Sequence, residues 1–84
     1  MRKITFENAL KFIEPNTNYW IYSDMVNTSF KAIPKIENNV ITIIDHDRFD
    51  VCFDKNDKFY ITKTNMLKIR SFDDGCCEMI KCKT

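Results

Sequence analysis

Glycine occurs only once in this chain, as Gly75, and proline occurs only twice. A single glycine excludes the glycine-rich loops that hold phosphate groups in nucleotide-binding proteins, because those loops need several positions of close backbone approach. Histidine also occurs only once. The sequence contains no catalytic or nucleotide-binding motif, so we expect a protein that is not an enzyme and has no cofactor.

Long apolar runs are missing as well. The longest uninterrupted run spans only a few residues, whereas a helix needs roughly 20 apolar residues to cross a bilayer. The first seven residues do not include the apolar stretch of a secretory signal. We therefore expect no membrane association and a cytoplasmic location with reduced thiols, which is the host cytoplasm if a phage or virus encodes the chain.

An excess of charge of either sign is also missing. Thirteen Lys and Arg against twelve Asp and Glu give a net charge of +1. No overall field would steer such a protein to nucleic acid, and a mimic of duplex DNA would be strongly acidic. Hydrophobic residues at 44% exclude a disordered chain. We expect residues 1–84 to form one domain that folds alone or as a homodimer.

What the sequence does contain is a series of short segments typical of strands. The apolar runs 40–44, 49–53 and 59–62 follow one another through short polar connectors, and residues 49–53 alternate apolar with other side chains. Alternation at period two predicts strands with one buried face, and connectors this short leave no room for crossover helices. The pattern predicts an antiparallel β-meander.

The remaining segments complete the expected fold. Further strands are predicted at 19–23, 30–36, 67–71 and 77–81. Thr5 is placed to cap a helix over 6–13, which Pro15 ends. Asn38-Asn39 and Asp73-Asp74-Gly75 predict hairpin turns, and Pro34 confines its strand to an edge or a bulge. A short helix is the alternative for the segment after Thr64. The predicted class is α+β, with a short N-terminal helix packed on a five- to seven-stranded antiparallel β-meander, or a small barrel.

Cysteines are the first candidate for chemistry. Cys76, Cys77 and Cys82 lie within seven residues and, with Cys52 or His46, could supply four zinc ligands. The spacing disfavours this site, because adjacent cysteines on a strand point to opposite faces and structural zinc sites use ligand pairs two to four residues apart. We expect buried or half-buried free thiols and no metal.

The densest titratable cluster is the segment Asp45-His46-Asp47-Arg48, with Asp50 close by. It lacks the spacing of a calcium loop, and a nucleophilic site would depend on the nearby Cys52. We expect a solvated hairpin tip. If the tip has a function, we favour partner binding by Asp45, His46, Asp47 and Arg48 over catalysis.

Aromatic residues form the last candidate. Trp20 and Tyr22 share one face of a predicted strand, and Tyr60 is available on another. Three interpretations are open: a second core face under the helix, exposed side chains for a protein partner, or a platform that stacks on bases. The lysines and arginines are spread along the chain, and Lys63, Lys68 and Arg70 are the nearest approach to a local basic patch.

The abundance of Ile, Lys and Asn, with two alanines and one glycine, indicates an AT-rich coding sequence. In general character the chain is similar to the small accessory proteins by which phages and mobile elements block bacterial defence nucleases, CRISPR effectors among them. We therefore expect a small protein-binding module that inhibits a larger enzyme, either a nuclease or a ribonucleoprotein effector. The alternative is a small β-barrel that binds single-stranded nucleic acid, and a hydrolase centred on His46 is a third, less favoured reading.

Overall fold

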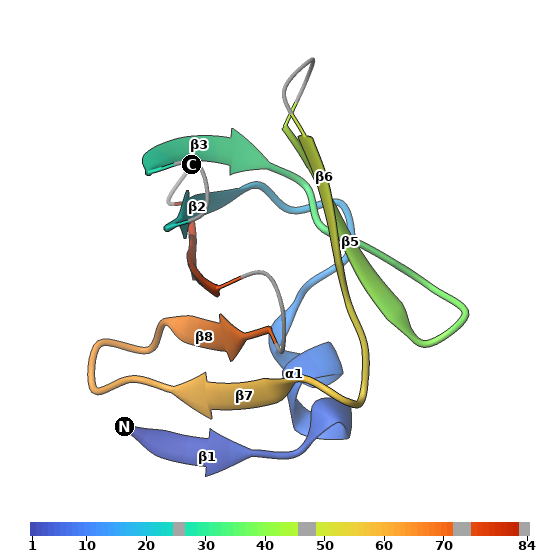
Figure 1. The fold of residues 1–84 in the computed structure, drawn as a ribbon, viewed down its shortest axis with the longest axis vertical. Coiled ribbons are helices and arrows are strands. Elements are labelled where there is room, and N and C mark those ends of the chain that lie inside the picture. The colour runs from blue at the N-terminus through green and yellow to red at the C-terminus, as the bar shows by residue number, and fades with distance from the viewer. Residues whose placement is uncertain (25–26, 46–48, 72–74, 83–84) are drawn as a thin grey trace.

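The computed structural model describes residues 1–24, 27–45, 49–71 and 75–82. These residues form two antiparallel sheets and one short helix (Figure 1). One sheet has six strands in the order β1-β7-β8-β9-β2-β3, and the small sheet has the order β4-β5-β6. The elements are β1 (Arg2–Ile4), α1 (Phe6–Phe12), β2 (Tyr19–Ser23), β3 (Thr28–Ala32), β4 (Lys35–Glu37), β5 (Val40–Asp45), β6 (Phe49–Phe53), β7 (Lys58–Ile61), β8 (Leu67–Arg70) and β9 (Cys76–Lys81).

The predicted α+β class is confirmed in its broad form, with strands dominating and the helix short. The barrel that was the alternative is not formed, because within the described residues each sheet keeps two open edges. The edges are β1 and β3 in the six-stranded sheet, and β4 and β6 in the small sheet.

The helix α1 begins where the sequence predicts. The Thr5 side chain accepts a hydrogen bond from the Asn8 N–H at 3.1 Å, which satisfies one free donor of the first turn. The helix ends at Phe12, one residue earlier than predicted, and Ile13 is already extended and buried in the core. Pro15 disfavours helical geometry just before it, so the chain turns toward β2 at this point.

Tyr19, the first residue of β2, holds the end of α1 in place. Its hydroxyl accepts a hydrogen bond from the Glu14 N–H at 2.9 Å and donates one to the Phe12 carbonyl at 3.1 Å. The side chain is only 1% exposed. The Tyr19 hydroxyl therefore provides hydrogen-bond partners for two backbone groups at the end of α1, where the helix itself provides none.

The core lies on one side of the six-stranded sheet, between that sheet, α1 and the small sheet. Every second strand residue points into it, and the Phe6 and Phe59 rings meet there with centroids 5.4 Å apart. The largest fully buried side chains are Tyr19, Ile21, Ile41, Ile43, Phe53, Phe59, Leu67, Ile69 and Met79. Ile41, Ile43 and Phe53 belong to the small sheet and the others to the six-stranded sheet, and we call the face of the six-stranded sheet that points into this core the inner face.

The strand predicted over 30–36 is divided in the structure. β3 ends at Ala32 and β4 begins at Lys35, with Ile33 and Pro34 between them. Pro34 has no N–H to give to a ladder, and the chain crosses here from the six-stranded sheet to the small sheet. Both strands beside it are edge strands, as expected for a proline in this position.

The predicted meander is correct for two of its three strands. β5 pairs with β6, but β7 does not continue that sheet and pairs instead with β1 and β8. A tight turn redirects the chain: the Asp54 N–H donates to the Asp57 side chain, and the Asp57 N–H donates to the Asp54 carbonyl. The partner strand β1 was not predicted, because three residues are too few to show alternation.

The hairpins are as predicted where the structure describes them. Asn38 and Asn39 both have positive φ, 51° and 60°, between β4 and β5. The tail forms the strand β8 rather than a helix, and β8 pairs with β9. Gly75 has φ +76°, and a Cβ there would overlap the Asp24 carboxylate, which accepts the Cys76 N–H at 2.8 Å. Residues 73 and 74 of this turn lie outside the described residues.

We expect Tyr19→Phe to lower the free energy of unfolding by about 1–3 kcal/mol, because it leaves two partly buried backbone groups without a partner. Tyr22→Phe is the matched control, since the Tyr22 hydroxyl bonds to the Asn27 side chain at an exposed position and its loss should cost at most about 0.5 kcal/mol. Urea unfolding of both variants measures the difference. Equal losses would contradict the anchoring role of Tyr19.

Candidate functional site

The second face of the six-stranded sheet is not covered by any described element. The helix contacts β7, and strand β5 of the small sheet contacts β3. Both contacts are on the inner side. In Figure 1 the small sheet stands at the right, beside the six strands. We call the uncovered face the outer face. Its residues are Lys3, Trp20, Tyr22, Ser29, Lys31, Lys58, Tyr60, Lys68, Arg70, Cys76, Glu78 and Ile80.

Strand register aligns these side chains in rows, because residues directly opposite each other in an antiparallel pair share a face. The longest row crosses all six strands. In order it contains Ser29, Tyr22, Glu78, Lys68, Tyr60 and Lys3. A second row contains Lys31, Trp20 and Ile80, and a third contains Cys76, Arg70 and Lys58.

The outer face is basic although the whole chain is nearly neutral. Five cations, Lys3, Lys31, Lys58, Lys68 and Arg70, share it with a single carboxylate, Glu78. With thirteen cations and twelve carboxylates in the chain, the rest of the molecule is left with more acidic than basic residues. Cations that are spread along the sequence therefore share one surface, since strand pairing brings five of them to the outer face.

Aromatic rings lie among these cations. Trp20 is 46% exposed and Tyr22 is 38% exposed, so the interpretation that they form a second core face under the helix is wrong. The Lys31 ammonium lies 5.1 Å from the centroid of the Trp20 ring, close enough for a cation–π contact. Tyr60 is half-buried between Lys3 and Lys68 in the longest row. The outer face thus carries rings and positive charges together, and Tyr60 and Trp20 are each next to a cation.

A shallow hollow lies on the outer face beside the exposed rings. Its volume is about 180 Å³, and Trp20, Tyr22, Met66, Glu78 and Ile80 contribute to its walls. Trp20 and Ile80 are cross-strand neighbours, and so are Tyr22 and Glu78. The hollow therefore provides an apolar floor between two rings and one carboxylate.

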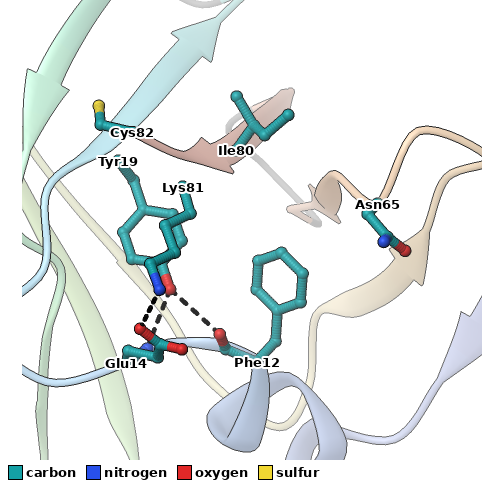
Figure 2. Close-up of a pocket in the computed structure, with 7 residues that line it drawn as sticks. All are labelled: Phe12, Glu14, Tyr19, Asn65, Ile80, Lys81 and Cys82. Carbon is teal, nitrogen blue, oxygen red and sulfur yellow. Dashed lines mark hydrogen bonds and ion pairs between the residues drawn. The ribbon is translucent and has the colours of Figure 1, made fainter. Parts of the chain in front are cut away.

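A larger hollow lies where the far end of β9 meets the end of α1 and the β7–β8 turn (Figure 2). Its volume is about 740 Å³, and its lining residues are Phe12, Glu14, Tyr19, Asn65, Ile80, Lys81 and Cys82. Figure 2 shows the Phe12 ring below Ile80, with Lys81 on one side and Asn65 on the other. We call this larger hollow the end hollow. Because Ile80 lines both hollows, the end hollow borders the outer face at Ile80.

The predicted loop site is only partly visible. His46, Asp47 and Arg48 lie outside the described residues, so their role as a partner-binding or catalytic cluster stays a prediction. Asp45 is the last residue of β5, opposite Phe49 in the small sheet. Lys63 is exposed in the β7–β8 turn rather than on the outer face, whereas Lys68 and Arg70 are on it.

The cysteines lie in different environments. Cys77 is buried on the inner face, its neighbour Cys76 is half-buried on the outer face, and Cys52 is exposed on the small sheet. Burial first, and then the negative charges of Asp24 and Glu78, raise the pKa of the Cys77 thiol to about 12. Among the described residues, no group of three or more His, Cys, Asp or Glu side chains is arranged to hold a metal ion.

Comparisons with known proteins identify no relative. No family model, no curated protein and no solved structure matched the chain. None of the helices in the described part of the chain is long and apolar enough to cross a membrane.

The raised pKa of Cys77 predicts a loss of stability in alkali. Between about pH 9 and 12 the folded protein keeps a proton that the unfolded chain releases, so the Cys77 contribution falls by about 1.4 kcal/mol per pH unit. Urea unfolding between pH 8 and 10 should show a shallower decline for Cys77→Ala than for Cys52→Ala, whose thiol is exposed. Parallel declines would contradict the prediction.

Proposed function

We propose that this chain is a non-catalytic binding module and that its outer face binds single-stranded nucleic acid. The observation that carries the proposal is the presence of five cations and three aromatic rings, with a single carboxylate, on one uncovered sheet face. Proteins that hold single strands combine these same two elements, since cations follow the phosphates and rings stack on bases of any sequence.

The spacing of the rings supports this proposal. Trp20 and Tyr22 are two residues apart on one strand face, which places them about 6.6 Å apart. The Trp20 ring is already next to a cation, Lys31. Tyr22 lies opposite Glu78, and Lys68 is the next residue of that row. Exposed rings can stack only on bases that are not already stacked within a duplex, so a single strand fits better than a double helix.

A larger protein is the second candidate partner. The observation that favours it is the exposure of large apolar side chains, with Ile80 beside Trp20 on the outer face and Ile33, Ile36 and Ile44 on or near the small sheet. Side chains of this kind form the centres of protein interfaces. In this case the module would inhibit a larger enzyme, such as a bacterial defence nuclease or a ribonucleoprotein effector, and its partner's surface would be acidic where it meets the outer face.

A salt titration separates the two candidates. We expect labelled single-stranded DNA or RNA to bind at low salt and to be released as salt rises, because phosphate contacts release counterions. Lys68→Gln should weaken binding and reduce the slope of log K against log salt by about 0.7, whereas Lys55→Gln, in an exposed turn off the outer face, should change neither. If no oligonucleotide binds at low salt, the nucleic-acid proposal is wrong and the protein partner becomes the better candidate.

The role of Trp20 has its own test. Trp20→Ala should weaken strand binding by about 1–3 kcal/mol, the usual value of one stacked base, while the loss of an exposed cation–π contact should cost only about 0.5–1 kcal/mol of stability. Trp20→Phe should restore most of the affinity because it keeps a ring. Anisotropy and thermal unfolding measure both effects, and a variant that loses stability but not affinity would make Trp20 a structural residue.

A further inference from the structure

The end hollow has walls suited to a flat, uncharged ring. Phe12 and Ile80 provide apolar walls, and the Phe12 and Tyr19 rings lie with centroids 6.2 Å apart at its base. Its volume, about 740 Å³, lies within the usual range for small-molecule sites. A flat group entering it would contact the Phe12 ring and the aliphatic side chain of Ile80.

The charges at the rim disfavour a phosphate inside the hollow. The Lys81 ammonium lies 2.6 Å from the Glu14 carboxylate, and this contact raises the pKa of Lys81. The pair is neutral as a whole, so the hollow offers no unpaired positive charge to an anion. The basic groups that suit phosphates are on the outer face instead, at Lys68 and Arg70.

Asn65 provides the polar group. Its backbone N–H donates to the Thr62 carbonyl, but its side-chain amide has no hydrogen-bond partner among the residues that the structure describes. A primary amide offers a donor and an acceptor side by side, which is the pattern that asparagine uses to pair with the edge of adenine. The hollow therefore presents stacking walls and one free amide.

We propose that the end hollow binds one unstacked nucleobase of a strand that crosses the outer face, with the base against Phe12 and Ile80 and its polar edge on the Asn65 amide. This inference rests on the proposed binding of single-stranded nucleic acid. Ile80 lies opposite Trp20 and also lines the hollow. A nucleic-acid strand with one base stacked on Trp20 would therefore pass over Ile80 to place another base in the hollow. The hollow would supply base preference, whereas the outer face supplies affinity without sequence.

Two small probes test the hollow separately from the outer face. Adenosine carries the base without a phosphate, and ribose 5-phosphate carries the phosphate without a base. In ¹H–¹⁵N NMR spectra we expect adenosine to shift the Asn65 side-chain amide and the Lys81 backbone amide, and ribose 5-phosphate to leave both unchanged. If adenosine does not shift them, or if ribose 5-phosphate shifts them equally, the base site is wrong.

Asn65→Gly provides the matching variant. Asn65 has φ 60°, so glycine removes the amide without straining the backbone, and Asn39→Gly makes the same change at the same φ in the β4–β5 turn. We expect Asn65→Gly to abolish the adenosine shift of the Lys81 backbone amide and to weaken binding of an adenine-containing single strand roughly three- to tenfold with an unchanged salt slope. Asn39→Gly should behave as the unmodified protein.

The outcomes distinguish the two proposals. If Lys68→Gln weakens strand binding but Asn65→Gly matches Asn39→Gly, the end hollow is not a base site and the outer-face proposal stands. If neither DNA nor RNA single strands bind the unmodified protein, the proposed function fails and this inference fails with it.

Discussion

The six-stranded sheet is covered on one face only, because the residues that the structure describes supply just one seven-residue helix and one three-stranded sheet to cover it. Both elements lie on the inner face, where alternate strand residues such as Ile21, Phe59 and Met79 are buried. A helix this short and a sheet this small are marginal by themselves, so each depends on that shared core. None of the described elements covers the outer face, and its side chains are exposed or half-buried.

Two short segments decide which sheet each strand joins. At Ile33-Pro34 the chain leaves the six-stranded sheet for the small one, and at the Asp54–Asp57 turn it returns. Neither change is visible in strand propensity, since the residues on both sides still favour strands. The return matters most for the binding surface, because it places β7 between β1 and β8 and so brings Tyr60 and Lys58 onto the outer face.

The sequence therefore predicts local features such as caps, strands and turns, but it does not predict which strands pair. The helix cap at Thr5, the strand 19–23, the Asn38-Asn39 turn and the β8–β9 hairpin each depend on a few neighbouring residues, and the structure has them all. The pairing of β7 depends on burying Phe59 against Phe6, two residues more than 50 positions apart. This choice of strand partner becomes favourable only when the helix and the sheet pack together.

The same distinction explains why the candidate surface was not predicted. The cluster at 45–48 is dense in sequence and easy to see, whereas Lys3, Lys31 and Lys68 share a face only through strand register. A register shift of one residue would move a whole strand's cations to the inner face, so composition alone cannot locate them.

A net charge near zero does not prevent the protein from binding an anionic partner. Salt screens charges beyond about 8–10 Å, so a bound strand responds to the cations beneath it more than to distant acidic residues. A chain with a net charge of +1 can therefore present a basic surface, provided that its fold separates the two signs. Here strand register makes that separation, since it brings five cations and only one carboxylate, Glu78, to the outer face.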